Sequence, residues 1–307
     1  MDAYATGTHY VDHLAPIWLA LDQRRGSFRV GPGRGLVEHA ARWGIMALRG
    51  RPTANPTLVA SYADERSCEG PVALLEHGAG QTYDTPDLDA VASRHQVELY
   101  LAPNQLVADR MAPVFPHARR VVVGSPRLEQ LASLERHPRW VALAWHWNQW
   151  GPAEARTAWG HYQHWLGDWA RQIPDLVGHA HPRMLRSVAG LYLAHGIEVV
   201  RWANELLAGA RVLVADNTSL LWEACALDIP VVVLDAPWYR IGVHHGLRFW
   251  EWADVGPRIR DAEALPEAVA AAEAPEWAPM RRAAAEAIYG PLAGSIDRAV
   301  SALKAWR

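Results

Sequence analysis

The chain has 307 residues, 50% of them hydrophobic, and a formal net charge of −3, which excludes a disordered protein and gives no signal for nucleic acid or anionic lipid. No apolar run approaches the roughly 18 residues of a membrane-spanning helix, and we expect no signal peptide because the N-terminus lacks that pattern. The two cysteines, Cys68 and Cys225, have no metal-type spacing, so we expect a cytoplasmic protein.

Short apolar runs alternate with amphipathic segments through the first half of the chain, which predicts a parallel sheet covered by helices. The predicted strands are 27–30, 57–61, 72–75, 97–101 and 120–123. A helix is expected from residue 13 to 21. The glycine-rich segment 31–35 predicts either a plain turn or a phosphate-binding loop, followed by a helix through Leu48.

The pattern lapses at a short polar stretch, 131–139, and then restarts. The strands expected after it are 141–145, 176–179, 197–200, 212–215 and 229–234, and the helices are 152–172, 183–195, 204–207, 220–227 and an alanine-rich tail. We therefore predict an α/β protein of two doubly wound Rossmann-like domains, an N-terminal domain over 1–135 and a C-terminal domain over 136–307.

The clearest βαβ unit lies at 211–237, where a buried strand ends in Asp216-Asn217-Thr218-Ser219 and a helix follows. Backbone N–H groups at a helix start lack partners and lie at its positive end, and the hydroxyls of Thr218 and Ser219 add donors. The tetrad therefore predicts a phosphate or diphosphate site, the alternative being an ordinary capped helix.

Two histidines follow predicted strands in open loops. His77 precedes Gly78-Ala79-Gly80-Gln81, where glycines let both backbone and imidazole approach a ligand, and His181-Pro182 follows the strand 176–179. His244 lies further along, after Arg240, in another predicted loop. For each histidine the alternative is a structural loop or core residue.

Metal ligands are a weaker possibility in two places. Asp87-Leu88-Asp89 resembles the DxD of metal-dependent sugar transferases, but acidic residues also favour the first turn of a helix. His161 and His164 lie one helical turn apart without a third ligand at a suitable spacing. We therefore expect no metal and no cofactor.

Tryptophan and arginine are both conspicuous in the composition. Sixteen tryptophans occur, and several flank predicted loops, where they either pack in the core or form an acceptor-binding surface. Lys304 is the only lysine, so nearly all the positive charge is arginine, a bidentate phosphate binder.

Several separated motifs together resemble the CDP-glycerol glycerophosphotransferases that polymerise wall teichoic acid, a family of GT-B fold whose two Rossmann-like domains face across a cleft. The resemblance rests on His77-Gly78, Gly124-Ser125-Pro126-Arg127 with Glu129, His181-Pro182, Asp216 to Ser219 with Glu223, Gly246 to Trp250, and Gly256-Pro257. Two positions depart from the family pattern: Thr82 stands where the family usually has lysine, and Asn217 replaces a tyrosine.

The resemblance implies a metal-independent transferase that moves a glycosyl or glycerophosphate group from a nucleotide-diphosphate donor to a hydroxyl on a glycan, a teichoic-acid-like polymer or another macromolecule. It also implies that the domain over 1–135 is the acceptor side, that the domain over 136–307 binds the nucleotide donor, and that the last helix packs back on the N-terminal domain. The alternatives are a nucleotide-sugar epimerase or hydrolase of the same fold, and a non-catalytic nucleotide-binding module.

The expected roles follow the motifs. His77 is the expected general base and His181 the group that stabilises the leaving nucleotide. The expected donor-binding residues are Arg127, Asp216, Asn217, Thr218, Ser219 and Glu223, the last on the ribose. The expected acceptor or loop contacts are Gly78, Gly80, Gln81, Arg240 and His244.

Overall fold

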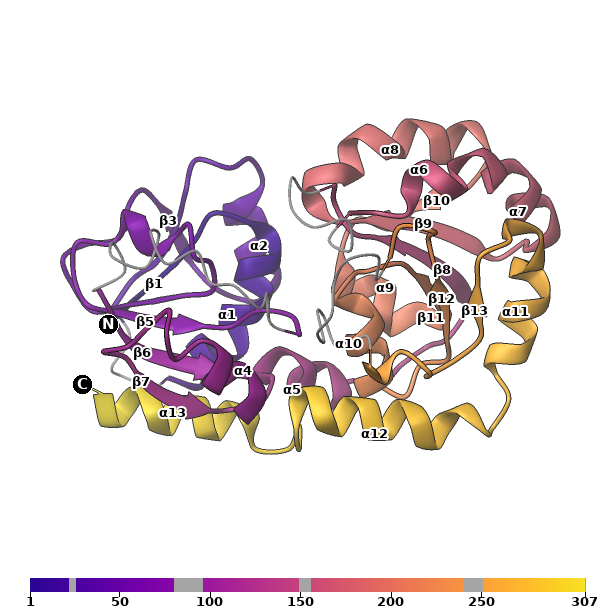
Figure 1. Ribbon diagram of the computed structural model, residues 1–307. Coiled ribbons are helices and arrows are strands. Elements are labelled where there is room, and N and C mark those ends of the chain that lie inside the picture. The colour runs from indigo at the N-terminus through magenta and orange to yellow at the C-terminus, as the bar shows by residue number, and fades with distance from the viewer. Residues whose placement is uncertain (22–25, 80–95, 149–155, 240–250, 307) are drawn as a thin grey trace. The chain divides into compact units, whose positions relative to one another are not determined.

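The computed structural model describes residues 1–21, 26–79, 96–148, 156–239 and 251–306, and the chain divides into two compact units (Figure 1). Unit 1 comprises Met1–Gln130 and Tyr289–Arg307, and unit 2 comprises Leu131–Ile288. The C-terminal segment therefore belongs to the same unit as the N-terminus.

Unit 1 is built on a seven-stranded sheet in the order β3-β2-β1-β4-β5-β6-β7, in which every strand pair is parallel. Its strands are β1 (Asp2–Ala5), β2 (Phe28–Val30), β3 (Ala47–Arg49), β4 (Thr57–Val59), β5 (Val72–Leu75), β6 (Val97–Ala102) and β7 (Arg119–Val122). The strand order reverses between β1 and β4, which makes their carboxyl ends the place where ligands bind in sheets of this kind.

The helices of unit 1 are α1 (Thr8–Ala20), α2 (Leu36–Arg42), α4 (Gln105–Arg110), α5 (Pro126–Ala132, across the boundary) and α13 (Ser295–Trp306), with the short 3₁₀ helix η1 (Glu65–Ser67). Helix α1 packs against both α2 and α13. Buried side chains such as Leu14, Ile17 and Leu303 join these helices to the strands in one hydrophobic core. Burying this apolar surface is the main force that holds α13 to the sheet.

The segment after β7 fixes the start of α13. The carboxylate of Glu129 accepts hydrogen bonds from the backbone N–H groups of Gly294 and Ile296, both at 2.6 Å. Gly124 has a φ of 81°, and a Cβ added there would lie 2.4 Å from Ser295 Oγ. Part of the Gly-Ser-Pro-Arg motif with its acidic residue therefore serves the packing of the last helix.

Unit 2 repeats the architecture with a six-stranded parallel sheet in the order β10-β9-β8-β11-β12-β13. Its strands are β8 (Trp140–Trp145), β9 (Leu176–Ala180), β10 (Glu198–Val199), β11 (Ala210–Ala215), β12 (Val231–Leu234) and β13 (Arg258–Ile259). In chain order this is 3-2-1-4-5-6, the Rossmann arrangement, with its switch point between β8 and β11.

The helices of unit 2 are α6 (Trp159–Tyr162), η3 (Gln163–Trp165), α7 (Leu166–Gln172), α8 (Pro182–Ala194), α9 (Ala203–Gly209), α10 (Leu220–Ala226), η5 (Ala262–Ala264), α11 (Leu265–Ala272) and α12 (Trp277–Tyr289). The central strands β8, β11 and β12 are almost entirely buried, as their continuous apolar runs predict for a sheet covered on both faces. Within the described ranges, no helix is long and apolar enough to cross a membrane.

The predicted α/β fold of two doubly wound parallel sheets is confirmed, but two predicted helices have wrong bounds and one strand was missed. The helix expected through Leu48 ends at Arg42, because Gly44 adopts a φ of 72° and the chain then forms β3. The strand β1 was not predicted, since four residues that include an aspartate give little signal. The helix expected over 152–172 is divided, in its described part, into α6, η3 and α7.

Candidate functional site

The polar residues of unit 2 gather at the switch point of its sheet. Strands β8 and β11 pair directly, with Ala144 opposite Ala215, so the residues that follow them leave the sheet at the same edge. His146 follows β8, and the tetrad Asp216-Asn217-Thr218-Ser219 follows β11. This edge is where open parallel sheets bind ligands.

Asp216 organises this edge from within the protein. Its side chain is fully buried, and its carboxylate accepts hydrogen bonds from His146 N at 2.7 Å, Thr157 Oγ1 at 2.8 Å and Ala158 N at 2.9 Å. Both carboxylate oxygens are therefore used by the chain's own donors. From the sequence, Asp216 was expected to bind the nucleotide donor. In the structure, its hydrogen bonds instead connect the loop after β8 to the segment before α6.

The rest of the tetrad leads into α10. Asn217 and Thr218 are buried, and Thr218 Oγ1 accepts a long hydrogen bond of 3.4 Å from Leu220 N. Ser219 is the residue at the N-cap, is partly exposed, and makes no capping bond with its side chain. Glu223, one turn further, is buried with 3% of its surface exposed. Ser219 is thus the more exposed of the two hydroxyl residues of the tetrad.

His181 lies beside this edge at the end of β9. It is the N-cap of α8, where its Nδ1 accepts a hydrogen bond of 3.2 Å from Arg183 N. Its ring centroid is 5.8 Å from that of His146 and 6.0 Å from that of Trp147. The structure therefore brings together His181, which was predicted as a site residue, and His146, which was not. A histidine directly after a buried strand was the signal for His146.

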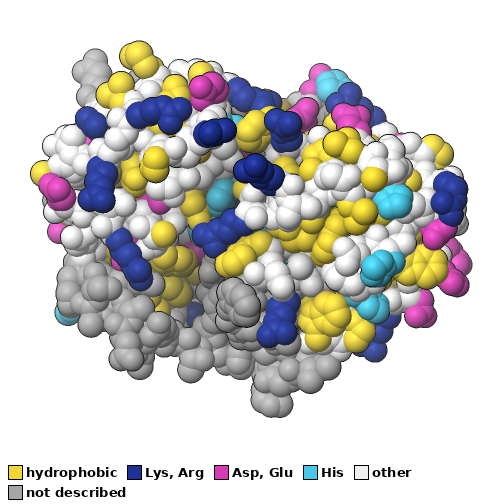
Figure 2. All heavy atoms as spheres, turned by 90° about the horizontal axis from the view of Figure 1, so that it is seen from above, with side chains coloured by type: hydrophobic (Ala, Val, Ile, Leu, Met, Phe, Trp, Pro, Cys, Tyr) yellow, Lys and Arg dark blue, Asp and Glu magenta, His cyan; other side chains and the backbone are white. Residues whose placement is uncertain are grey.

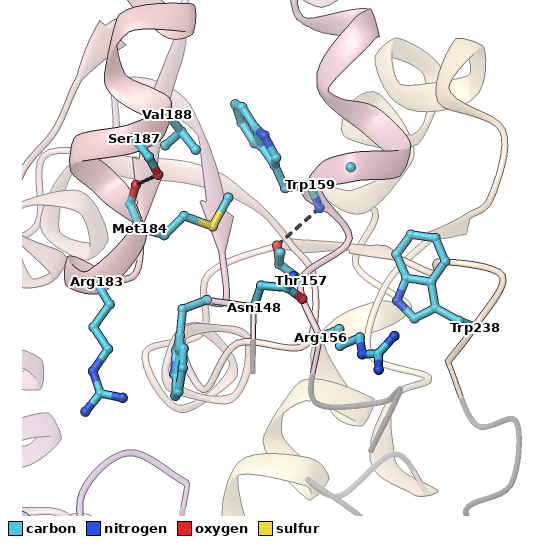
Figure 3. Close-up of a pocket in the computed structure, with 11 residues that line it drawn as sticks. Asn148, Arg156, Thr157, Trp159, Arg183, Met184, Ser187, Val188 and Trp238 are labelled. Carbon is cyan, nitrogen blue, oxygen red and sulfur yellow. Dashed lines mark hydrogen bonds between the residues drawn. The ribbon is translucent and has the colours of Figure 1, made fainter. Parts of the chain in front are cut away.

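A pocket of about 720 Å³ adjoins this edge, wholly within unit 2 (Figure 3). It is lined by Trp147, Asn148, Arg156, Thr157, Trp159, Gly160, Arg183, Met184, Ser187, Val188 and Trp238. Thr157 connects the pocket to the tetrad, because its Oγ1 donates to Asp216 and accepts a hydrogen bond of 3.1 Å from Trp159 N. Some of the loop tryptophans noted in the sequence therefore line one cavity.

His77 occupies the corresponding edge of the sheet in unit 1. It follows β5, and Gly78 after it adopts a φ of 62°, a conformation that glycine tolerates without strain. The His77 side chain is 17% exposed and lies among aromatic rings, with centroid distances of 5.2 Å to Tyr10 and 6.0 Å to His13. It is therefore partly open to solvent within an otherwise enclosed cluster.

Glu76 is the acidic neighbour of His77. Its buried carboxylate accepts hydrogen bonds from the hydroxyls of Tyr62 and Tyr100, the latter at 2.5 Å, and its Oε1 is 4.0 Å from His77 Nδ1. Burial raises the pKa of Tyr100 well above its usual value, and the negative charge of the nearby Glu76 raises this pKa further. The phenol therefore remains a hydrogen-bond donor.

His13 and Arg127 complete the unit 1 cluster. Burial lowers the pKa of His13 well below its usual value, and the positive charges of Arg127, His77 and His9 lower it further. Arg127 itself is 3% exposed. The structure thus places Arg127 in the cluster of His77. His9 and His13 share one face of α1 at a spacing of four residues, and sequence reasoning missed both because β1 before that helix was not predicted.

The remaining predicted positions lie outside the described residues: Gly80, Gln81, Arg240, His244 and the Asp87-Leu88-Asp89 motif. Among the described residues, no group of three or more His, Cys, Asp or Glu side chains could hold a metal ion. His161, considered with His164 as a metal pair, has its Nε2 3.3 Å from the carbonyl oxygen of Arg260.

At the level of sequence, no protein-family model and no curated protein matches the chain. Solved structures do match it over almost its whole length. The UDP-GlcNAc 2-epimerase of Methanocaldococcus jannaschii, in complex with UDP-GlcNAc and UDP, has 15% identity and a TM-score of 0.64, and the alignment covers 99% of each chain.

Two further structures are similar to the same extent. The wall teichoic acid polymerase TagF, soaked with CDPG, has 11% identity and a TM-score of 0.64 over 99% of this chain and 87% of that one. The S. aureus MnaA structure with UDP has 12% identity and a TM-score of 0.62 over 99% of this chain and 96% of that one. The chain therefore has the GT-B fold.

Proposed function

We propose that this protein is a GT-B transferase that moves a glycosyl or glycerophosphate group from a nucleotide-diphosphate donor to an acceptor hydroxyl. The observation that carries the proposal is the convergence of His146, His181 and the Asp216–Ser219 segment on the switch point of the unit 2 sheet. The structural likeness to a protein soaked with CDPG and to others that hold UDP supports a nucleotide as the ligand.

The chemistry of transfer assigns a role to each group at this edge. As the donor bond breaks, negative charge develops on the departing nucleotide, a nucleoside diphosphate in glycosyl transfer or a nucleoside monophosphate in glycerophosphate transfer, and must be stabilised where it forms. The Ser219 hydroxyl is accessible, and the His181 imidazole lies at the same edge of the sheet. We assign this stabilisation to Ser219 and His181, with no metal ion. Asp216 holds the surrounding loops in place and does not itself bind the donor.

The acceptor hydroxyl needs a base, and we assign that role to His77. An imidazole has an unperturbed pKa near neutral pH, which suits proton transfer, and the Nδ1 atom of His77 lies 4.0 Å from the Glu76 carboxylate. His13 remains neutral near pH 7, because burial and its positive neighbours oppose its protonation. It is therefore available as a hydrogen-bond partner without adding a charge.

Epimerisation of a nucleotide sugar is the second candidate. It is favoured by the likeness to the UDP-GlcNAc 2-epimerase of M. jannaschii, whose fold matches this chain as well as that of TagF does. The same unit 2 edge would then hold the nucleotide diphosphate while the sugar is changed. The acceptor hydroxyl, and with it the role of His77 as its base, distinguishes transfer from this reaction.

Product analysis separates the two reactions. The purified protein is incubated with CDP-glycerol or UDP-GlcNAc in EDTA, with and without a glycan or glycerol phosphate polymer as acceptor, and the products are resolved by liquid chromatography and mass spectrometry. Transfer predicts free nucleotide together with an extended acceptor, and epimerisation predicts an isomeric nucleotide sugar without any acceptor. If neither product forms from either compound, the result contradicts an enzymatic function with these substrates.

The His77→Ala variant tests the base in the same assay. We expect kcat to fall by about 10²–10⁴-fold while donor affinity remains unchanged, since the imidazole acts on the acceptor. His164→Ala is the matched control, because His164 is exposed on η3 away from the site. Equal turnover of the two variants would exclude His77 as the base, and a parallel loss of donor affinity would assign it to phosphate binding.

A further inference from the structure

The pocket beside the unit 2 edge combines aromatic faces with positive charge. Three tryptophans line it from three separate segments: Trp147 after β8, Trp159 in α6 and Trp238 after β12. Arg156 and Arg183 are its charged residues, and no carboxylate occurs among the described residues that line it. Its volume of about 720 Å³ is in the usual range of small-molecule sites, about 300–1,000 Å³.

The aromatic rings are held in place by their neighbours. Trp159 packs edge-on against Trp145 and Tyr192, each with its ring centroid 5.5 Å away. Trp238 packs edge-on against His161 at 5.9 Å. Indole rings fixed in this way offer flat apolar surfaces at little cost in side-chain entropy. The C–H face of a sugar ring is a flat surface that stacks on such an indole.

The arginines supply the second half of the recognition. The Arg183 guanidinium lies 4.5 Å from the Trp147 ring centroid, and this stacking orients its plane. A guanidinium held in this way can still donate two parallel hydrogen bonds to a phosphate or carboxylate. Figure 3 shows Arg183 on the α8 side of the pocket and Arg156 on the side of Trp238, so the two charges lie at separate places around the cavity.

The surface around this side of unit 2 is consistent with an anionic ligand. In Figure 2, which looks down on the side of unit 2 that carries α8, hydrophobic side chains (yellow) lie next to basic ones (dark blue), nearly all of which are arginine because Lys304 is the only lysine. A neutral sugar would leave the arginines without an anionic partner, and a cation would meet two positive charges.

We propose that the pocket binds a sugar unit that carries a phosphate or carboxylate group, its ring on the tryptophan faces and its anion on Arg183. This inference rests on the proposed function in one respect, that the sugar belongs to a substrate of the transferase or of the epimerase. The sugar can come from the acceptor or from the transferred part of the donor, and both sources share this chemistry.

Nuclear magnetic resonance of the full ¹⁵N-labelled chain tests the pocket directly. The indole N–H signals of Trp147, Trp159 and Trp238 are assigned with single Trp→Phe variants, and glucose 6-phosphate, glucuronic acid and glucose are titrated in turn. We expect saturable shifts of the pocket signals with the two anionic sugars, and binding of glucose weaker by about tenfold or more. The signal of Trp252, an exposed tryptophan outside the pocket, should not move.

Arginine variants test the anion. Arg183→Met should weaken the binding of glucose 6-phosphate by about 10–100-fold, the range expected for loss of a hydrogen bond to a charged group. Arg186→Met is the matched control, since Arg186 is exposed on the same helix and does not line the pocket. The proposal is overturned if no sugar shifts the pocket signals, if glucose binds as well as its phosphate, or if the two variants behave alike.

Competition with nucleotides identifies the source of the sugar. Displacement of glucose 6-phosphate by UDP-GlcNAc but not by UDP assigns the pocket to the transferred group, and simultaneous binding assigns it to the acceptor. If UDP alone displaces the sugar and shifts all three indoles, the pocket holds the nucleotide and the proposal fails. If no nucleotide binds anywhere while the sugar phosphate does, the proposed function fails and the sugar site stands.

Discussion

Replacement of Asp216 by alanine tests whether this carboxylate organises the unit 2 edge or binds the donor. The substitution leaves three donors without an acceptor: the backbone N–H groups of His146 and Ala158 and the hydroxyl of Thr157. Hydrogen bonds to a charged group contribute about 1.5–3 kcal/mol each, and buried donors left unpaired cost about 1–3 kcal/mol. Allowing for relaxation and entry of water, we expect a loss of about 3–5 kcal/mol in the free energy of unfolding.

Urea denaturation followed by circular dichroism measures this loss. Titration with UDP and CDP, without urea and at a temperature where the variant is folded, measures the effect on nucleotide binding. Asp168→Asn is the control, because Asp168 is 42% exposed and pairs with Arg171 on the surface. Thr157→Val removes two hydrogen bonds, the one donated to Asp216 and the one accepted from Trp159 N, and should lower the free energy of unfolding by about 2 kcal/mol. An Asp216→Ala variant as stable as the Asp168 control, but unable to bind nucleotide, would refute the structural role and restore the donor-binding one.

Three further predictions concern unit 1. Burial raises the pKa of Asp64 to about 6 from 3.8, so the unfolded chain binds fewer protons than the folded one between these values. The free energy of unfolding should therefore fall by about 2 kcal/mol as pH rises from 4 to 6. Asp64→Asn should flatten this slope, and an unchanged slope would contradict the assignment. Glu129→Ala should lower the free energy of unfolding by about 2 kcal/mol and speed amide hydrogen exchange in α13, because two backbone N–H groups lose their acceptor. Glu135→Ala, at an exposed position, should do neither. Gly124→Ala should destabilise the protein by about 2 kcal/mol or more, because Gly124 has a positive φ and Ser295 Oγ lies close to the added Cβ. Gly190→Ala, inside α8, should stabilise the protein by about 0.5–1 kcal/mol. Equal melting temperatures of the two variants would contradict both predictions.

The sheets were predictable because buried parallel strands carry continuous apolar runs, as β5 and β11 do. The tetrad after β11 was also located from sequence, since turn-forming residues followed a clear strand. The contacts of Asp216 were not predictable, because its partners lie 58 to 70 residues earlier in the chain. His146 was missed for the same reason: only the strand order places β8 beside β11 and brings it next to His181.

Two features of the unit 1 cluster show the same limit. The short strand β1 gave no clear pattern, so the two histidines on the helix after it had no sheet edge to be assigned to. The acidic residue of the Gly-Ser-Pro-Arg motif could be found from sequence, but its bonds to the start of α13 join residues more than 160 positions apart. Independence from metal ions and a cytoplasmic location stay predictions.

The most direct test of the central claim is calorimetric titration of UDP and CDP, in EDTA, into the wild-type protein and the Ser219→Ala variant. The account predicts that at least one nucleotide binds without metal, and that loss of the Ser219 hydroxyl weakens it by about 10–100-fold, the equivalent of about 1.5–3 kcal/mol. Ser133→Ala, at an exposed position of unit 2, should bind as the wild type does. Binding that disappears in EDTA, or equal affinity in the Ser219 and Ser133 variants, would contradict a metal-independent diphosphate site at this edge of the sheet.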